Sequence, residues 1–303
     1  MTQARRAPRV DLVVPTSGRP SLRTLLDALA AGSGPLPGRI LLVDDRSAPE
    51  APLLPQGPPP RLADRVEALR GKAAGPAAAR NTGWRASEAE WVAFLDDDVV
   101  PDPDWCVRHF EDLAGLDRDV AGSQGLVRVP MPEDRRPTDW ERNVKGLEGA
   151  PWITANIAYR RAALEEVGGF DERFPRAYRE DVDLGLRVTA AGYRIERRQC
   201  AVTHPVRPAG PLVSVRLQAG NADDALMRAL HGPGWRERAG VPAGRRQLHL
   251  AVTAAGAAAL LGLITGRRGL SLLGSLGWLA GTAEFAWRRI APGPRTLREI
   301  GTM

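Results

Sequence analysis

The first hundred residues alternate short aliphatic runs with segments of helical periodicity, and this alternation limits the fold more than any other feature. Val10–Val14 and Ile40–Val43 are β-branched and aliphatic runs, and between them Ser21–Ala31 carries leucines at helical spacing. Further along, the pattern predicts a helix over Pro76–Ser87 and a strand over Trp91–Leu95. Repeated strand–helix units predict an α/β fold with an open, mostly parallel sheet flanked by helices.

Polar residues follow three of these strands, at the point where each strand ends. They are the segment Thr16–Arg19, the pair Asp44–Asp45 and the triplet Asp96–Asp98. The carboxyl ends of parallel strands meet at one edge of a sheet, where ligands bind. Three adjacent carboxylates repel one another unless a cation or hydrogen-bond donors offset their charge. The triplet therefore predicts a site for Mg²⁺ or Mn²⁺, with a solvated acidic loop as the alternative.

The middle of the chain has a mixed pattern. Helices are expected over Trp105–Leu116 and Arg161–Val167, and strands over Gly122–Val129 and Ile153–Tyr159. A helix that starts at Asp181 and a polar helix around residues 221–224 follow. The pattern divides the chain into residues 1–104, 105–230, a linker at 231–245 and a hydrophobic helical hairpin at 246–303.

The last segment differs in kind from the rest. Leu248–Thr265 is an apolar stretch of 18 residues without formal charge, and Leu270–Trp287 is a weaker stretch that contains Glu284. Arginine pairs at 245–246, 267–268 and 288–289 flank every end, so charge gives no orientation. The hairpin can span a membrane, lie in its surface or pack on a soluble core. We favour membrane association.

Composition excludes several classes of protein. The formal net charge is +6 and all but two of the 42 basic residues are arginine, but these are scattered, without the basic stripe and interleaved aromatics of a nucleic-acid binder. The two cysteines, Cys106 and Cys200, are too few for a disulfide framework or a zinc cage. The first apolar run ends at Pro15, too early for a signal peptide, so we expect a cytoplasmic amino end.

Seven short blocks carry a resemblance to a known family. The blocks are Val13–Arg19, Leu42–Ser47, Gly75–Gly83, Phe94–Asp98, Asn156–Arg161, Gly168–Phe174 and Arg179–Leu184. In this order, the chain resembles an inverting family 2 glycosyltransferase with the GT-A fold over about residues 10–205. The resemblance implies that residues 1–104 bind a nucleotide-diphosphate sugar and that 105–230 bind the acceptor and carry the catalytic group.

The resemblance also implies roles for individual residues. Asp45 matches the acid that reads the nucleobase, Arg80 and Asn81 match the helix that steadies the donor, and Asp97 matches the ribose contact. Thr16 and Arg19, after the first strand, are further candidates for donor contacts. Asp98 matches the direct metal ligand, with Asp96 completing the triplet. His204 lies where some relatives supply another metal ligand, although a packed or loop histidine is an equal alternative.

Asp181 matches the catalytic base of the family. Inverting transfer needs a group that takes the proton of the acceptor hydroxyl, and a carboxylate at the start of a helix is held ionised by the free amide hydrogens. The alternative is that Glu180 and Asp181 merely cap this helix. Trp152, Asn156 and Glu180 are the candidates for acceptor contacts, the acceptor being a glycan or a lipid-linked molecule of the cell envelope.

Two rival functions fit parts of the sequence. Phe94–Val100 also fits the strand motif of haloacid-dehalogenase-like phosphohydrolases, with Asp96 and Asp98 as the catalytic pair and Lys145 as the phosphate-binding lysine. A non-catalytic, membrane-tethered protein that binds nucleotide sugars is the second rival. The preferred hypothesis is metal-assisted, inverting sugar transfer at the cytoplasmic face of a membrane.

Overall fold

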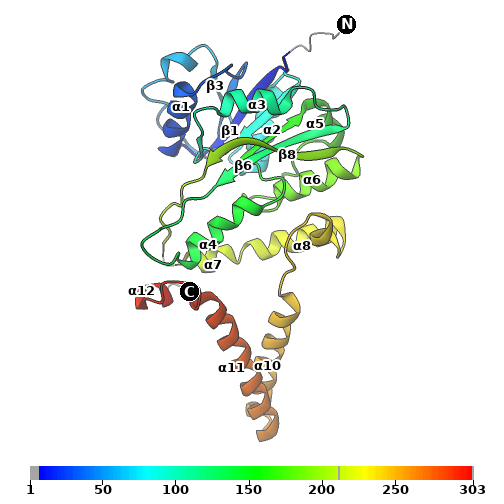
Figure 1. The fold of residues 1–303 in the computed structure, drawn as a ribbon. Coiled ribbons are helices and arrows are strands. Elements are labelled where there is room, and N and C mark those ends of the chain that lie inside the picture. The colour runs from blue at the N-terminus through cyan, green and yellow to red at the C-terminus, as the bar shows by residue number, and fades with distance from the viewer. Residues whose placement is uncertain (1–6, 211, 302–303) are drawn as a thin grey trace. The chain divides into compact units, whose positions relative to one another are not determined.

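A computed structural model describes residues 7–210 and 212–301, and the chain divides into two compact units (Figure 1). Unit 1 comprises the described parts of Met1–Pro130, Lys145–Arg207 and Ala219–Gly240, and unit 2 those of Met131–Val144, Pro208–Gln218 and Val241–Met303. Both units are thus assembled from separate stretches of sequence.

Unit 1 is built on a sheet whose strands follow the order β3-β2-β1-β4-β7-β6-β8-β5. Its eight strands are β1 (Val10–Thr16), β2 (Ile40–Asp44), β3 (Val66–Arg70), β4 (Trp91–Leu95), β5 (Val100–Pro101), β6 (Val120–Arg128), β7 (Asn156–Arg160) and β8 (Arg194–Thr203). The pairs β1–β2, β1–β4, β2–β3 and β6–β8 are parallel. Strand β7 runs antiparallel to both neighbours, and β5 is antiparallel to β8. The described part of the sheet therefore has four parallel pairs and three antiparallel ones. The polar residues follow β1, β2 and β4, which lie in its parallel half.

Helices pack on this sheet through apolar stripes. The α-helices of unit 1 are α1 (Ser21–Ala31), α2 (Pro76–Ala86), α3 (Trp105–Leu113), α5 (Arg161–Val167), α6 (Glu180–Ala190), α8 (Gly220–His231) and α9 (Trp235–Arg238). Short 3₁₀ turns lie at Pro60–Leu62 and Gly146–Gly149. Side chains from β1, β2, β4 and β7 form one buried cluster with residues of α2, α5 and α6. Both α2 and α6 are therefore fixed firmly beside the sheet.

The close approach of α2 to the sheet depends on Gly83. A Cβ at this position would lie 2.3 Å from the Val13 Cγ1 atom on β1 and 3.1 Å from Val43 on β2. Such distances are far below van der Waals contact, so a larger residue would push the helix away. Glycine here lets α2 lie against two strands whose ends carry the polar residues.

Unit 2 contains the predicted hairpin and three short helices. Its elements are α4 (Asp139–Lys145), α7 (Val213–Leu217), α10 (Arg246–Ile264), α11 (Arg268–Ile290) and α12 (Leu297–Ile300). Helices α10 and α11 pack against each other along their length. The Arg289 guanidinium donates to Asp139 and to Ser214 Oγ, and the Asp139 amide donates to Glu299 Oε1. A polar network therefore ties the short helices to the end of α11.

The predicted elements agree with the structure at most positions. The bounds Ser21–Ala31, Trp91–Leu95 and Arg161–Val167 are confirmed to the residue. The second strand of the mixed region begins at Asn156 rather than Ile153, and the stretch 231–245, expected to be a linker, contains α9 with its buried Trp235. Strand β8 and helices α4, α7 and α12 were not predicted.

Candidate functional site

The carboxyl ends of β1 and β4 bring together the polar segments that follow them. The Thr16 hydroxyl donates to Asp97 Oδ2 (2.6 Å), and the Arg19 guanidinium donates to Asp97 Oδ1 (2.9 Å). The Gly18 amide donates to Thr16 Oγ1 (3.0 Å), which holds the turn after β1 in place. The expectation that these segments meet is confirmed, and Asp97 is almost fully enclosed by them.

Asp45, at the end of β2, faces the start of α2. Its Oδ2 accepts a hydrogen bond from the Gly75 amide (2.8 Å), whereas its buried Oδ1 has no protein partner among the described residues. Gly75 has φ +95°, and a Cβ there would lie 2.4 Å from the Pro175 carbonyl oxygen, so only glycine fits. A buried acceptor without a donor costs free energy, which a ligand group with an N–H would recover.

A buried arginine connects the acid triplet to α6. The Arg80 side chain is 1% exposed; its two terminal nitrogens donate to Asp96 Oδ1 (2.7 Å) and Glu180 Oε1 (2.8 Å). Its guanidinium also lies 5.6 Å from the centre of the Phe170 ring. A buried charge persists only where partners compensate it, so this pair of contacts fixes the end of β4 to the start of α6. Arg80 and Glu180 are therefore buried against each other, while Arg80 Nε and Glu180 Oε2 have no hydrogen-bond partner among the described residues. Their donor and acceptor contacts stay predictions.

Asp181 lies in the first turn of α6 and is partly exposed. Its Oδ1 accepts from the Val182 amide (2.7 Å), while the residue at the N-cap is Arg179, with φ +76° and no side-chain cap bond. Burial raises the pKa of the Asp181 carboxyl to about 6, against the opposing effects of the Val182 amide and the nearby arginines. We expected the helix start to favour the ionised form; burial raises the pKa instead, and at about 6 the carboxyl is still mostly ionised at neutral pH.

Asp98 is the second carboxyl of the site whose charge is poorly solvated. Burial and the neighbouring Asp96 raise its pKa, and His204 and Arg207 oppose that rise. Its Oδ1 lies 3.5 Å from His204 Nε2, and its Oδ2 lies 3.1 Å from Arg207 Nε. The structure therefore brings His204 to the triplet, as the sequence led us to expect, although a metal role for it stays a prediction.

The donor set of Asp98 and His204 fits a divalent cation. Carboxylate oxygen and imidazole nitrogen are ligands of Mn²⁺ and Mg²⁺ sites, and desolvation of Asp98 favours a cation beside it. No cluster of three or more His, Cys, Asp or Glu side chains suited to a metal occurs in the described part of the chain. The two side chains would therefore need phosphate oxygens or water to complete the coordination.

Asn81 faces the core instead of the open edge of the sheet. Its amide nitrogen donates to the Phe170 carbonyl (2.8 Å), and its oxygen accepts from the Phe170 amide (2.9 Å) and Trp84 Nε1 (2.8 Å). Each polar group is thus taken by the protein, so the predicted donor contact of Asn81 has no free group to make it. Asn81 instead links α2 to the turn at Gly168–Phe170 through these hydrogen bonds.

Asn156 is likewise directed into the interior. Its amide nitrogen donates to the Leu126 and Cys200 carbonyls (3.0 Å each), and its oxygen accepts from Trp105 Nε1 (3.1 Å). The side chain is almost completely buried at the centre of β7, β6 and β8. The predicted acceptor contact is therefore replaced by a structural one, because Asn156 is 1% exposed and its amide group is bonded to Leu126, Cys200 and Trp105.

Trp152 lies against α6. A Cβ on Gly185 would lie 2.1 Å from the Trp152 ring, so the indole occupies the space that this glycine leaves. Gly185 follows Asp181 by one helical turn, which puts the ring along the same face of α6 as the carboxyl. Trp152 has φ +57° and is partly buried, so an acceptor contact beside Asp181 stays a prediction that the geometry accommodates.

Arg207 is a member of the site that sequence reasoning missed. It follows His204 in residues 204–210, where the structure has no helix or strand. No periodicity or turn motif distinguishes it from the other scattered arginines. The spacing of two residues between His204 and Arg207 was the available signal, since both side chains approach Asp98.

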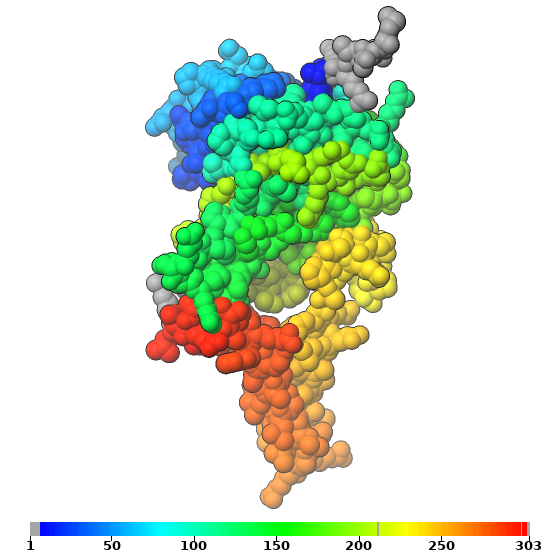
Figure 2. All heavy atoms as spheres, in the orientation of Figure 1, coloured from blue at the N-terminus to red at the C-terminus, as the bar shows by residue number. Residues whose placement is uncertain are grey.

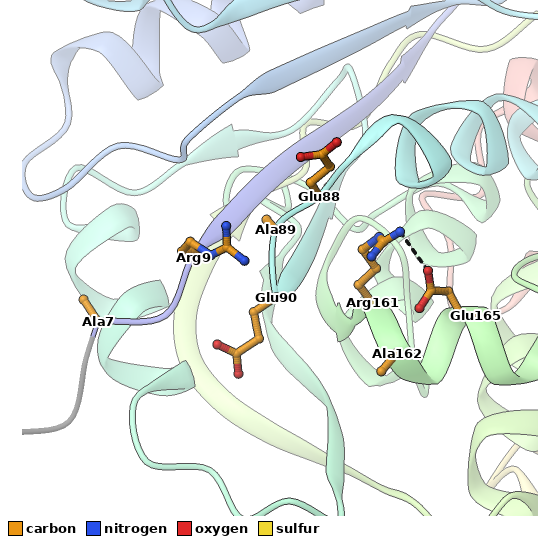
Figure 3. A pocket seen from close by; sticks show the side chains of 8 residues that line it. All are labelled: Ala7, Arg9, Glu88, Ala89, Glu90, Arg161, Ala162 and Glu165. Atoms are coloured by element: carbon orange, nitrogen blue, oxygen red, sulfur yellow. Dashed lines mark ion pairs between the residues drawn. The ribbon is translucent and has the colours of Figure 1, made fainter. Parts of the chain in front are cut away.

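A hollow elsewhere on unit 1 is not part of this site. Figure 3 shows it, with the ion pair of Arg161 and Glu165 (2.8 Å) on its wall. It has a volume of about 400 Å³ and is lined by residues that precede β1 and β4 and by the start of α5. It therefore lies at the amino ends of those strands, opposite the acids.

Known proteins are similar in sequence to the region that carries the aspartate triplet. The family model of glycosyl transferase family 2 matches residues 11–174. The O-antigen biosynthesis protein RfbC of Myxococcus xanthus is 31% identical over 224 residues, 63% of this chain and 17% of the relative. The pre-mycofactocin glycosyltransferase of Mycobacterium tuberculosis is 36% identical over 143 residues, 42% of this chain and 29% of the relative. The chain thus matches less than a third of the length of these two relatives.

A solved structure shares the fold. The crystal structure of GalNAc-T7 with UDP, GalNAc and Mn²⁺ superimposes with a TM-score of 0.51 at 16% identity, covering 80% of this chain and 58% of that chain. The likeness concerns the fold alone and confirms the GT-A-like architecture that we expected. Since the family model matches more than half of the residues, the chain belongs to glycosyl transferase family 2.

Proposed function

We propose that the chain transfers a sugar from a nucleotide-diphosphate donor to an acceptor hydroxyl, with inversion at the anomeric carbon. One observation carries the proposal: Arg80 joins Asp96 (2.7 Å) and Glu180 (2.8 Å), so the partly exposed Asp181 is held beside the acid triplet. A base and a site for a leaving diphosphate are the two groups that such a reaction needs.

Asp181 is the proposed general base. The acceptor oxygen forms a bond to the anomeric carbon, the bond from that carbon to the donor phosphate oxygen breaks, and the acceptor proton passes to Asp181. A base works best when its pKa lies close to the working pH, and burial raises the pKa of Asp181 to about 6. The nucleoside diphosphate leaves with the electron pair of the broken bond.

The donor is proposed to lie over the strand ends. Asp45 would offer its unpartnered Oδ1 to the nucleobase, and Asp97, with Thr16 and Arg19 beside it, would contact the ribose. Asp98 and His204 are the residues that would hold Mg²⁺ or Mn²⁺, which would neutralise the leaving diphosphate. GalNAc-T7, which shares the fold, was crystallised with UDP and Mn²⁺.

Asp98→Asn tests the metal role. The asparagine keeps the shape of the side chain but loses the charge, so nucleoside diphosphate should no longer bind in a Mn²⁺-dependent manner. Calorimetry with UDP and GDP, each with and without Mn²⁺, measures this, and Asp27→Asn, an exposed change on α1, is the control. If Asp98→Asn binds nucleotide as the unaltered chain does, the triplet has no metal role.

The rival phosphohydrolase function fits the geometry less well. Lys145, its expected phosphate-binding lysine, donates to the Val129 carbonyl (3.1 Å) and to Glu148 Oε1 (2.7 Å). Asp96 is held by the buried Arg80, which leaves it poorly placed as a nucleophile. Hydrolysis of an aryl phosphate by the unaltered chain would favour this rival, and diphosphate binding without any transfer would favour the non-catalytic one.

We also propose that the hairpin of unit 2 lies in a lipid membrane. Its small residues face the other helix and its large apolar side chains face outward, which is the reverse of the arrangement in a soluble helix pair. Glycines line its seam: a Cβ on Gly274 would lie 2.5 Å from the Ala259 amide nitrogen, and one on Gly281 would lie 2.2 Å from Val252 Cγ2. The large apolar side chains point outward instead. They include Leu250, Leu260, Leu261, Leu263, Ile264, Leu272, Leu273, Leu276, Leu279 and Trp287.

Small residues at the seam and large apolar residues outside are typical of helices in lipid. Within the described residues, α10 is the helix that is long and apolar enough to cross a membrane, with 11% of its apolar window buried. Its 19 residues correspond to about 28 Å, near the thickness of the hydrocarbon layer. A lipid-linked acceptor at the cytoplasmic face would suit an enzyme anchored in this way.

Flotation with vesicles tests the membrane role. Leu261→Asp combined with Leu273→Asp puts two charges on the outward face and should release the protein from phosphatidylcholine–phosphatidylglycerol vesicles. Leu230→Asp, on an exposed position of α8, is the matched control and should float as the unaltered chain does. Aggregation of the double variant in detergent, with loss of helix content, would instead indicate a soluble packed pair.

A further inference from the structure

Each aspartate of the triplet pairs with a different arginine, and these arginines differ in exposure. The pairs are Asp96–Arg80 (2.7 Å), Asp97–Arg19 (2.9 Å) and Asp98–Arg207 (3.1 Å). The Arg80 side chain is 1% exposed, whereas Arg19 and Arg207 are 43% and 49% exposed. The guanidinium of Arg80 is therefore buried beneath a partly exposed Asp96, and the other two pairs have their guanidinium groups at the surface.

Asp98 has the largest number of basic side chains close to its carboxylate among the three aspartates. Its side chain is 6% exposed, and its two oxygens face His204 Nε2 and Arg207 Nε. Arg19 approaches the same Oδ2 atom at 3.9 Å. A cation that approaches Asp98 from solvent therefore meets the Arg207 guanidinium, and two positive charges on one carboxylate oxygen repel each other.

Arg207 pairs with Asp98 at the surface, with its side chain 49% exposed, whereas Arg80 is buried between its two partners. An ion pair with one exposed member contributes little, about 0.2–1 kcal/mol, so it breaks readily. The segment 204–210 has no helix or strand to hold the side chain in one direction. A guanidinium also matches two phosphate oxygens with parallel hydrogen bonds, which gives it a natural second partner.

We propose that Arg207 is an exchangeable counter-ion of Asp98. It neutralises the carboxylate while the donor is absent, and it moves to the donor diphosphate when a divalent cation binds at Asp98. This inference rests on the proposed function, because it takes the diphosphate to bind at the triplet. No covalent bond is made or broken in the exchange, and the total charge of the site changes only by the sum of the negative charge of the donor and the positive charge of the cation.

The proposal predicts effects of opposite sign on two binding reactions. Without Arg207 the cation has one competitor fewer at Asp98, where Arg19 stays at 3.9 Å, so Arg207→Ala should bind Mn²⁺ alone more tightly, by up to about fivefold. The same variant lacks the guanidinium contact to the diphosphate, so UDP or GDP in saturating Mn²⁺ should bind about tenfold more weakly. Arg207→Lys keeps the positive charge but loses the planar guanidinium that donates two parallel hydrogen bonds. This variant should bind Mn²⁺ as the unaltered chain does and should bind nucleotide with intermediate affinity.

Calorimetry on the full-length chain and its variants makes both measurements. Arg108→Ala, which removes an exposed arginine that pairs with Asp104 (3.2 Å) on α3, controls for the loss of one positive charge. It should change neither affinity by more than about twofold.

Three results would overturn the inference. If Arg207→Ala weakens Mn²⁺ binding, Arg207 holds Asp98 in position rather than competing with the cation. If nucleotide binds equally well to the variant and the unaltered chain, Arg207 does not reach the diphosphate. If the unaltered chain binds no nucleotide in any arm, the proposed function fails as well, whereas a failure confined to the variant comparison leaves that function standing.

Discussion

The sheet of unit 1 and the hairpin of unit 2 use similar apolar residues in opposite ways. Leu12, Leu42 and Phe94 of the sheet are fully buried, whereas Leu261 and Leu263 of the hairpin are more than half exposed. Figure 2 shows the outer atoms of the hairpin as the orange region of the chain. The same kind of side chain is therefore placed inward where water surrounds the unit and outward where, as we propose, lipid does.

Charged side chains are buried in the site of unit 1 but lie closer to the surface in the hairpin. Unit 1 buries Arg80 and Glu180 at the centre of its site, each held by the other. In the hairpin, Arg245 and Glu284 pair near its base (2.6 Å), and Arg267 and Arg268 occupy its turn. Burying charge is costly and is usually tolerated for function, so unit 1 is the region where we expect chemistry.

Asp181→Asn should give the largest effect and confine it to unit 1. The amide keeps the size of the side chain but cannot take the acceptor proton, so the transfer rate should fall by about 10²–10⁴. Donor affinity and vesicle binding should stay the same, since the other proposed ligands and the hairpin are untouched. Transfer assays, calorimetry and flotation on one preparation measure all three.

A helix cap would behave differently. Near-normal turnover with a melting temperature lowered by a loss of about 1 kcal/mol would assign Asp181 to capping and leave the base unidentified. Arg179 holds the N-cap position of α6, but Asp181 Oδ1 accepts from the Val182 amide in the first turn, so the variant decides between the two roles. Asp27→Asn, on the exposed face of α1, serves as the control for a lost surface charge.

The sequence was informative where local pattern determines structure. The leucine spacing in Ser21–Ala31 and the apolar run Trp91–Leu95 gave their elements to the residue, because burial of one face decides both. Strand β8 was missed because Arg194–Thr203 alternates charged and partly buried residues, and pairing with β6 rather than its own apolar content makes it a strand. Helices α7 and α12 are too short for periodicity to reveal.

The site was predictable at strand ends and less so elsewhere. Thr16, Arg19 and the triplet meet because parallel strands bring their carboxyl ends to one edge, a rule that needs no tertiary detail. The burial of Asn81 and Asn156 depends on partners 30 to 89 residues away, which pattern alone does not locate. The raised pKa of Asp181 arises from packing around α6, and the position at a helix start suggested the opposite direction.

A matched pair of leucine truncations should give the next largest effect and sharpen the comparison directly. Leu42→Ala leaves a cavity in the core of unit 1 and should lower the free energy of unfolding by about 2–5 kcal/mol. Leu261→Ala removes a side chain that is 54% exposed and should leave that free energy unchanged to within about 0.5 kcal/mol. Denaturant unfolding in mild detergent measures both.

The two truncations should exchange rank on vesicles. Removing three outward carbon atoms from Leu261 should weaken partitioning by about 1–2 kcal/mol, whereas Leu42→Ala should have no effect on it. A large loss of unfolding free energy for Leu261→Ala, with unchanged partitioning, would mean that the outward face is covered by protein in solution.

The smallest expected effect is a dependence of the transfer rate on pH. Asp181 must be ionised to act as a base, and burial raises the pKa of its carboxyl to about 6, so the rate should rise about tenfold between pH 5 and pH 7 and reach half its maximum near pH 6. Stability should move in the other direction. The folded chain holds protons on Asp181 and Asp98 that the unfolded chain releases at lower pH, so the contribution of these two groups to stability is greatest in acid and declines as the pH rises through the raised pKa values. Rate profiles and melting curves in metal-free buffer measure these opposite trends. The Asp181→Asn chain should lose the rise in rate, and a flat profile in the unaltered chain would show that the proton goes to another group.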